Sequence, residues 1–463
     1  MLNQHAAERA LSTALSSGGD FSEIYLEDTD ATTMTMTSGK METAVSGRSF
    51  GAGVRVFKGT NSVYVYTNDG SEAGLVKAAE QAAAAVGAQQ GAQNVSLSWS
   101  DTPQAHPIEI KPASVDAARK ADKVRQAYLA SASYDPLVVQ TEVSYKDWSK
   151  HFWLANSEGL YTSDERTYSR LFATAVASDG SESQTGQFGP GRQMGFELFK
   201  CVVDPEAIGR HVAAMAVTML KAELCPAGRM PVVIDNGFGG VIFHEACGHA
   251  LEATSVSKGR SVFAGKLGQA IASPAVTAID DATIRNAWGS GNIDDEGLPC
   301  RRTVLIEKGI LKSYLIDRLG GRRMGMQPTG SGRRQDYRFA PTSRMSNTYI
   351  APGSYSNDEI IASVSSGLYC KSMGGGSVNP ATGEFNFAVR EGYLIENGRI
   401  SRPVRGATLI GFGSEVLLKI DMVGKELDFG TGMCGSLSGS IPADVGQPMV
   451  RVSEMTVGGR KQG

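Results

Sequence analysis

The chain has 463 residues, of which 41% are hydrophobic and 20% are charged, and its formal net charge is −3. This length is too great for one ordinary hydrophobic core, so two domains are expected. The slightly negative charge argues against non-specific nucleic-acid binding as the main task, and no apolar run is long enough to predict a transmembrane helix.

The number and spacing of the cysteines indicate the cellular compartment of the protein. Six of them are spread through the sequence without a C-x-x-C pair, and the first residues lack the basic segment and apolar core of a secretory signal peptide. In a chain of this length, such cysteines indicate a reduced, cytoplasmic protein. A cysteine with a chemical role would therefore be a metal ligand or a nucleophile rather than half of a disulfide.

The N-terminal half alternates between helices and groups of strands. Residues 21–69 and 137–180 alternate in polarity and are interrupted by glycine, asparagine and aspartate, which predicts two groups of short antiparallel strands. Asp69 is in position to cap the alanine-rich helix that follows. Residues 88–112 are polar, contain prolines and predict a loop. The helices are expected over residues 4–16, 70–86, 114–133 and 204–225.

The C-terminal half is rich in glycine, which favours short strands and turns. It begins after a joint at Pro226-Ala227-Gly228, with a strand predicted over residues 229–238. A hairpin is predicted over residues 303–317 with its bend at Lys308-Gly309, and a helix near residues 357–366. The expected fold class is α+β with two domains. Residues 1–222 form an N-terminal domain of antiparallel strands with helices, and residues 223–463 form a β-rich C-terminal domain.

The stretch FHEACGHALEA, residues 243–253, places His244, Glu245 and His249 within six residues. Histidines beside a carboxylate are typical of zinc peptidases, which usually show H-E-x-x-H on a helix. The spacing here is one residue longer, so the two imidazoles would stand roughly 140° apart on a regular helix. It therefore predicts a local distortion, either a π-bulge or an early helix end or bend that Gly248 permits. The alternative is a core helix in which two histidines occur by chance.

A metal site would need a further ligand, and two cysteines are candidates. Cys247 lies three residues after His244 and therefore near it, but three ligands from one distorted turn make an awkward geometry. Cys434 lies in FGTGMCGSLSGS, where the glycines predict a tight turn that could present a thiolate from another element. These residues also fit G-x-G-x-x-G, but no helix follows, so a dinucleotide site is rejected. His211, in an apolar helix, is expected to be a partly buried structural residue.

With these residues in view, the chain resembles the TldD/PmbA family of zinc metallopeptidases, on the side of its metal-bearing TldD subunit. The resemblance covers nearly the whole chain. Its segments, in chain order, are YLED…GVRV…VYTND, FHEACGHALEA, RMSNTYIAPG, GGGSVNPATGEFNFAVREGYLIENG, PVRGATLIG and GMCG…VGQPMVRVSEMTVGG.

The resemblance implies one zinc ion bound by His244, His249 and Cys434, with Glu245 as the general base of peptide-bond hydrolysis. It implies unfolded or extended peptides as substrates, in leader trimming or peptide turnover in the cytoplasm. It also implies a dimer, with a metal-free PmbA-type relative or with a second copy. The active site would lie in a chamber between the two subunits that admits unfolded chains only, with the N-terminal domain forming the dimer and the chamber. Neither a membrane nor nucleic acid is expected as a partner.

Two other functions remain open. One is a non-catalytic, metal-stabilised regulatory or partner-binding protein, such as the gyrase modulators with which this family has been associated. The other is a cysteine hydrolase in which Cys434 works with a histidine. The arginine-rich residues 320–338 are expected to form a solvated loop, or else a mobile flap that grips a peptide backbone or a C-terminal carboxylate.

Overall fold

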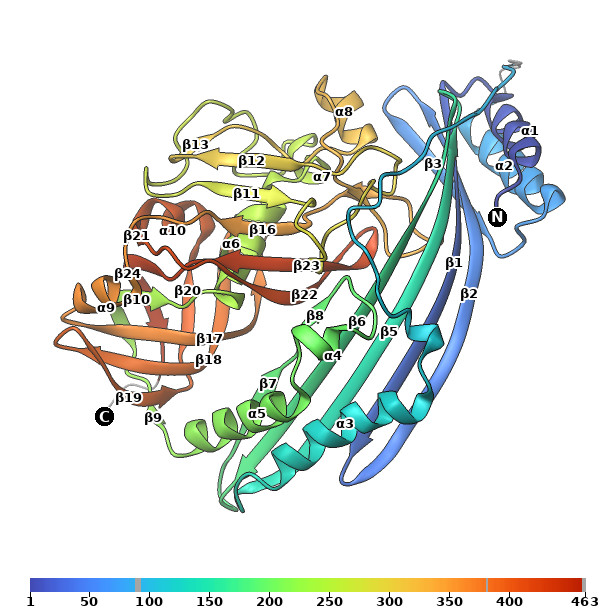
Figure 1. The fold of residues 1–463 in the computed structure, drawn as a ribbon. Helices are drawn as coiled ribbons and strands as arrows, with labels where there is room; N and C mark the ends of the chain where they lie inside the picture. The colour runs from blue at the N-terminus through green and yellow to red at the C-terminus, as the bar shows by residue number, and fades with distance from the viewer. Residues whose placement is uncertain (88–92, 380–381, 460–463) are drawn as a thin grey trace.

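The computed structural model of the protein describes residues 1–87, 93–379 and 382–459. Its fold is mixed α+β, which confirms the predicted class. One eight-stranded sheet is formed by residues 21–192, and a second eight-stranded sheet and a six-stranded sheet are formed by residues 223–458. Figure 1 shows the long, curved strands of the first sheet beside the elements of the C-terminal half.

The first sheet has the strand order β3-β2-β1-β5-β6-β4, with β7 and β8 also paired to β6. Its neighbouring strands in this path are antiparallel, as predicted, except that the short β4 runs parallel to β6. The strands are β1 (Phe21–Thr37), β2 (Lys40–Lys58), β3 (Asn61–Thr67), β4 (Ser98–Trp99), β5 (Val138–Asn156), β6 (Leu160–Ser178), β7 (Ser183–Phe188) and β8 (Gly191–Arg192).

The prediction of short strands was wrong, because β1, β2, β5 and β6 each have 17 to 19 residues. Glycines that were interpreted as interruptions lie inside strands, where they allow close packing. A Cβ on Gly53 would lie 1.8 Å from the Tyr64 hydroxyl, and one on Gly51 would lie 2.3 Å from the Tyr337 ring. Gly51 therefore leaves room for the ring of Tyr337, a residue of the C-terminal half, to pack on β2.

Four longer helices cover this sheet in two pairs. Near one end, α1 (Gln4–Leu15) and α2 (Glu72–Val86) share a core with β1 and β2; near the other, α3 (Ala117–Ala132) and α5 (Pro205–Leu220) pack on β5 and β6 (Figure 1). The N-cap of α2 is Ser71, whose hydroxyl accepts from Gly74 N, and not Asp69 as predicted. Asp69 instead accepts a hydrogen bond from Ser71 N. The short helices η1 (Pro112–Ser114) and α4 (Leu198–Cys201) lie between them in sequence.

The loop predicted over residues 88–112 is described only from residue 93 onward, since residues 88–92 lie outside the described residues. The described part has little regular structure apart from β4. No helix in the described part of the chain is long and apolar enough to cross a membrane.

In the second eight-stranded sheet, β17, β10, β24, β20 and β18 are neighbours, and an extra β17–β18 pairing closes these five strands into a ring. Strands β19, β9 and β21 extend it. The bounds are β9 (Glu223–Leu224), β10 (Gly228–Ile234), β17 (Ser366–Val378), β18 (Glu384–Glu396), β19 (Arg399–Arg405), β20 (Thr408–Phe412), β21 (Ile420–Val423) and β24 (Val450–Gly458).

The six-stranded sheet has the order β13-β12-β11-β16-β23-β22, so β22 is an edge strand. The predicted hairpin is confirmed, since β12 and β13 pair across Lys308 and Gly309, which both have positive φ. The strands are β11 (Ala278–Asp281), β12 (Arg302–Glu307), β13 (Ile310–Leu311), β16 (Asn347–Ile350), β22 (Asp428–Ser436) and β23 (Gly439–Gln447), beside a separate pair, β14 (Gly332–Arg333) and β15 (Thr342–Ser343). The remaining helices include α8 (Arg318–Met324), α9 (Asn357–Ala362) and α10 (Gly413–Lys419).

Buried ion pairs join the first sheet to the C-terminal half. Arg55 pairs with Glu296 at 2.5 Å, Arg166 with Asp295 at 2.9 Å, and Arg334 with Glu23 at 2.8 Å. Buried charges are stable only when paired, and removing one partner of such a pair is costly. These contacts therefore fix how the long sheet lies against the C-terminal half.

The arginine-rich residues 320–338 belong to this contact, so the prediction of a solvated loop was wrong for much of the segment. Arg334 is buried, and Arg323 donates to the main-chain carbonyl of Thr60 at 2.9 Å. Arg322 contacts the carboxylate of Asp20. The pattern of glycines and arginines suggested solvent exposure throughout, but the N-terminal half supplies acceptors that bury Arg334 and hold the exposed Arg322 and Arg323 in place.

Candidate metal centre

The H-E stretch forms a broken helix. A single turn, α6 (Val241–Phe243), leads into a π-helical turn, η3 (His244–Gly248), and then into a 3₁₀ turn, η4 (His249–Leu251), before the short α7 (Ala253–Val256). The His249 N–H donates to the His244 carbonyl, an i→i+5 hydrogen bond. The predicted local distortion is thus confirmed as a π turn. Widening this turn brings residues five apart toward the same side of the helix.

Close packing explains the small residues of the π turn. Ala246 and Cys247 are buried in the C-terminal core, and Gly413 lies against the turn. Gly248 has an ordinary helical φ of −58°, so it does not end or bend the helix as predicted. Glycine is needed at this position because it leaves room for the Met345 side chain, since a Cβ there would lie 2.2 Å from Met345 Sδ.

We expect the substitution Gly413→Ala to destabilise the protein and shift the π turn. Its Cβ would lie 2.3 Å from the Ala246 carbonyl oxygen, a main-chain atom that cannot rotate away. Overpacking of this kind costs about 1–3 kcal/mol, measurable as a lower midpoint of urea unfolding. Gly47→Ala is the matched control, because it lies on an exposed part of β2 with no atom within 4 Å of the new Cβ. Equal midpoints for both variants would contradict the argument.

Cys434 comes from β22, almost at the end of the strand. The prediction of a tight turn around it was wrong, because residues 428–436 pair with β23 as an antiparallel hairpin and Cys434 faces Ile441. The turn lies just beyond, ending at Gly439 with a φ of 85°. Glycines in this strand again mark close approaches, as at Gly430, whose Cβ would lie 2.6 Å from Phe238.

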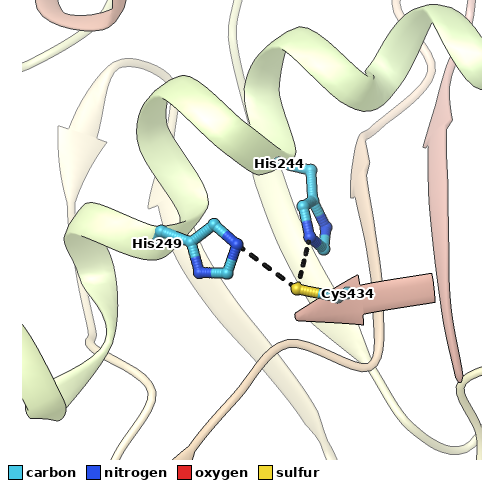
Figure 2. A group of neighbouring side chains, drawn as sticks. All are labelled: His244, His249 and Cys434. Atoms are coloured by element: carbon cyan, nitrogen blue, oxygen red, sulfur yellow. Dashed lines mark hydrogen bonds between the residues drawn. The ribbon is translucent and has the colours of Figure 1, made fainter. Parts of the chain in front are cut away.

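Figure 2 shows that both histidines point at this cysteine. The Cys434 Sγ lies 3.2 Å from His244 Nε2 and 3.3 Å from His249 Nε2. The three donor atoms lie within 4.8 Å of one another, and His244 and Cys434 are buried. The structure therefore brings together the three residues that the resemblance implied as metal ligands.

The other cysteine candidate lies apart from this group. Cys247 is buried, its Sγ contacts the Gly413 carbonyl at 3.6 Å, and burial raises the pKa of its thiol. A buried neutral thiol is a poor metal ligand. His211, predicted to be partly buried, is exposed on α5 and packs edge-on against Phe188 with ring centroids 5.1 Å apart.

The pKa values of Cys434 and His249 are linked by their contact. Burial would raise the pKa of Cys434, but His244 and His249 outweigh it and lower that pKa to about 3. For His249, burial lowers the pKa, while Glu252 and Cys434 raise it well above its ordinary value. Without a metal, these shifts favour a Cys434 thiolate paired with a protonated His249. A metal ion would displace that proton, and a thiolate with two neutral imidazoles is a donor set that zinc prefers. In addition, the buried His244 Nδ1 has no hydrogen-bond partner in the structure.

Two residues that sequence reasoning missed lie behind the donors. The Glu252 carboxylate lies 3.2 Å from His249 Nδ1, and Arg344 Nε lies 3.9 Å from the other oxygen of Glu252. Arg344 is fully buried and also donates to the carbonyl of Cys434 at 2.5 Å. The i, i+3 spacing of His249 and Glu252 could have indicated the first contact. Nothing in the sequence near Arg344 indicates the second.

Glu245 lies at the open side of the group. Its side chain is 34% exposed, and its Oε2 lies 3.7 Å from His249 Nε2. A carboxylate that solvent can reach, beside a buried cluster of metal-type donors, is able to exchange protons with a water molecule held there.

Models of three domains of one family match successive parts of this chain. PmbA/TldA metallopeptidase domain 1 matches residues 22–86, the central domain matches residues 110–220, and the C-terminal domain matches residues 227–459. The last of these matches contains the whole candidate metal centre.

Curated relatives match over most of their length. A Metalloprotease TldD homolog of Haemophilus influenzae is 36% identical, covering 95% of this chain and 93% of that protein. A metalloprotease of Methanothermobacter thermautotrophicus is 37% identical, covering 95% and 96%. A Zinc metalloprotease TldD homolog of Saccharolobus solfataricus is 30% identical over 70% of this chain and 72% of its own.

Solved structures share the fold. A proposed modulator of a DNA gyrase from Thermotoga maritima has a TM-score of 0.80 at 23% identity, with 98% of this chain and 99% of that chain covered. TldE from Thermococcus kodakarensis has a TM-score of 0.76 at 18% identity, with 98% and 99% covered. Identities this low support similarity of fold only.

Proposed function

Because this chain belongs to the PmbA/TldD metallopeptidase family, we propose that it is a zinc-dependent peptidase that cleaves unfolded or extended peptides. The observation that carries the proposal is the group of His244, His249 and Cys434 with the reachable carboxylate of Glu245 beside it. The test is to purify the protein, count zinc per chain, and assay cleavage of an unfolded polypeptide with and without any partner that copurifies. About one zinc ion per chain together with cleavage is the expected result.

In this proposal the two Nε2 atoms and the thiolate hold one zinc ion. When bound, the zinc would supply Lewis-acid chemistry, polarising the scissile carbonyl and lowering the pKa of the attacking water. Glu245 takes the proton from that water and later passes it to the leaving amine. Glu252 orients His249 through Nδ1, which leaves Nε2 free to act as a donor.

The proposed way of binding substrate rests on the edge strand. β22 carries Cys434 and, among the described residues, pairs with a strand on one side only, while its other side has a single isolated bridge, between Phe429 and Gly237. An extended peptide could add to its free side through main-chain hydrogen bonds, which would give loose sequence preference. A folded protein could not offer such a strand, which agrees with unfolded substrates.

We also propose the cytoplasmic dimer that the resemblance implies. The partner would be a metal-free PmbA-type relative or a second copy, with residues 1–222 as the domain that forms the dimer and its chamber. The name TldE of one structural neighbour supports a partner of this kind. The mass of the purified complex would decide between the two kinds of partner.

A non-catalytic regulator is the second candidate, because two structural neighbours are named as proposed modulators of DNA gyrase. A structural zinc site has no need of a reachable carboxylate beside its ligands, whereas Glu245 is partly exposed. We therefore favour the peptidase. Zinc without cleavage in any pairing would favour the regulator.

Substitution of Glu252 or Arg344, the two residues behind the donors, should change the affinity for zinc. We expect Glu252→Gln to weaken zinc binding roughly 10- to 100-fold, as loss of a carboxylate behind a ligating histidine typically does. Arg344→Lys should weaken it as well, because lysine cannot reach both Glu252 and the Cys434 carbonyl with a planar fork. Competition with a chromogenic chelator measures both affinities.

The control for these variants is Glu307→Gln, an exposed carboxylate at the end of β12. Spectra of the cobalt-substituted protein add a readout that general destabilisation would not change. Zinc binding by Glu252→Gln as tight as by the unaltered chain would contradict a role for this carboxylate.

A further inference from the structure

Two clefts lie along β22 between the first sheet and the C-terminal half. The smaller has a volume of about 440 Å³ and reaches Met433, the neighbour of Cys434. The larger has a volume of about 910 Å³ and reaches Gly430 and Thr431 of the same strand. Both are lined by Arg170 of β6, which therefore lies where they meet.

The smaller cleft, which we call the aromatic cleft, has a wall of three rings. Trp148 and Tyr168 stack with centroids 4.8 Å apart, and Trp288 meets both edge-on at 5.3 Å. Trp288 is held by a hydrogen bond from its indole nitrogen to the carbonyl of Gly432 on β22, at 2.8 Å. The wall is thus fixed to the strand that carries the cysteine donor.

The charges of the aromatic cleft do not balance. Each acidic residue in its lining is already paired: Glu27 with Lys150 at 3.1 Å, Asp295 with Arg166 at 2.9 Å, and Asp336 with Arg338 at 2.6 Å. Arg334 pairs with Glu23 outside the lining. Among the described residues, this leaves three lining cations without a carboxylate within ion-pair distance: Lys146, Arg170 and Arg333.

These three cations are not equivalent. Arg333 is buried, and its donors are used by the main-chain carbonyls of Met345 and Pro442. Lys146 is exposed, with its Nζ 5.4 Å from the centre of the Trp148 ring. Lys146 and Arg170 therefore remain able to meet an incoming group.

Arg170 is the better placed of the two. Its Nε donates to Gly189 O at 2.8 Å and its Nη2 to Thr431 O at 3.3 Å, while Nη1 has no hydrogen-bond acceptor among the described residues. Burial lowers its pKa to about 10, with only partial compensation from Asp444, which makes no ion pair with it. A guanidinium that has lost water without gaining a carboxylate is stabilised by an anionic ligand.

We propose that the aromatic cleft binds a carboxylate of the substrate polypeptide, with Arg170 and Lys146 as the cationic anchors and the three rings as the wall for the neighbouring residue. This inference rests on the proposed peptidase function and names its substrate class: peptides with an acidic residue or a free C-terminal carboxylate. The larger cleft is lined by Asp204 and Asp428 as well as by cations, and neither carboxylate forms an ion pair among the described residues, so these two carboxylates would repel an anionic group there.

Binding can be tested without relying on turnover, in the zinc-loaded protein with Glu245→Gln. The probes are extended alanine- and threonine-based decapeptides in matched forms: one glutamate against one glutamine, and a free C-terminus against an amidated one. Calorimetry measures each dissociation constant. We expect roughly tenfold or tighter binding of a carboxylate form, the usual effect of a hydrogen bond to a charged group. Whether the glutamate pair or the C-terminal pair shows it identifies the source of the carboxylate.

Variants then assign the preference to the cleft. Arg170→Gln should remove it, and Lys146→Glu, at an exposed position, should reverse it toward peptides with lysine in place of glutamate. Arg48→Gln is the control, since Arg48 is an exposed arginine of the first sheet that is paired with Asp28. Equal binding of all matched forms, binding of none of them, or a preference that survives Lys146→Glu would overturn the inference. If the unaltered protein cleaves none of the peptides while the binding preference is present, the result would instead count against the peptidase proposal.

Discussion

The substitution Glu245→Gln should abolish peptide hydrolysis while the protein keeps its zinc. Glutamine preserves the size of the side chain but cannot accept the proton of the attacking water, and general-base catalysis contributes about 10²- to 10⁴-fold to such reactions. The side chain is 34% exposed, so the change should not disturb the core. Cleavage of an unfolded polypeptide and zinc per chain, measured on the same preparation, check both halves of the expectation.

A matched carboxylate serves as the control. Glu415 lies in the first turn of α10, which packs near the π turn, and is exposed. Glu415→Gln should cleave as the unaltered chain does. Full activity in Glu245→Gln would remove Glu245 from the mechanism and reopen the cysteine hydrolase, in which the nucleophile is a thiolate and no carboxylate is needed beside it.

The substitution Cys434→Ser should abolish zinc binding at neutral pH together with activity. A serine hydroxyl is not deprotonated there, so one of the three donors is lost outright. The loss of affinity should exceed the roughly 10- to 100-fold that changes behind the ligands cause. Zinc content after dialysis and chelator competition measure it.

Substitutions of two other cysteines are the controls for Cys434→Ser. Cys201→Ser, at an exposed position, and Cys247→Ala, whose thiol faces Gly413 rather than the donors, should both keep their zinc. Loss of zinc from Cys247→Ala in a folded protein would show that the donor set is wrong.

Removal of the metal separates the two hydrolytic hypotheses. A chelator should inactivate the unaltered protein, and zinc should restore it, if the metal supplies the Lewis acid. A cysteine hydrolase based on Cys434 would keep its activity after chelation and lose it on alkylation of the thiol. Both hypotheses predict an inactive Cys434→Ser, so the chelator experiment is needed beside that variant.

Local patterns in the sequence determined much of the secondary structure. The amphipathic helix at the N-terminus, the helix after Asp204, and the hairpin with its bend at Lys308-Gly309 all lie where the pattern predicted them. The spacing of His244 and His249 predicted a local distortion, because a spacing of five residues on a regular helix would point the rings apart, and the π turn is one of the forms that the sequence left open. Such features depend on contacts between residues close in sequence, which is why the sequence alone is sufficient for them.

The tertiary structure decided the features that depend on distant partners. Gly51 and Gly53 read as breaks, yet Tyr337 and Tyr64 fill the space they leave and let β2 continue. The arginines of residues 320–338 read as solvated, yet Arg322, Arg323 and Arg334 find acceptors in Asp20, Thr60 and Glu23, hundreds of residues away. A glycine in a strand can mark a break or make room for a ring from another segment, and an arginine can be solvated or bound to a distant acceptor. Which of these holds depends on contacts that form only in the folded protein.

For the candidate metal centre too, some features follow from the local sequence and others only from the tertiary structure. The sequence alone places two candidate donors and the carboxylate together, since His244, Glu245 and His249 lie within six residues of one another. Left to residue chemistry alone, the choice between Cys247 and Cys434 stayed open. The fold places the β22 thiolate 3.2 Å from His244 and turns Cys247 into the core, while Arg344 ties the Cys434 carbonyl to the carboxylate behind His249. Donors from separate segments are brought within ångströms only by the packing of the whole C-terminal half, and no local pattern carries that information.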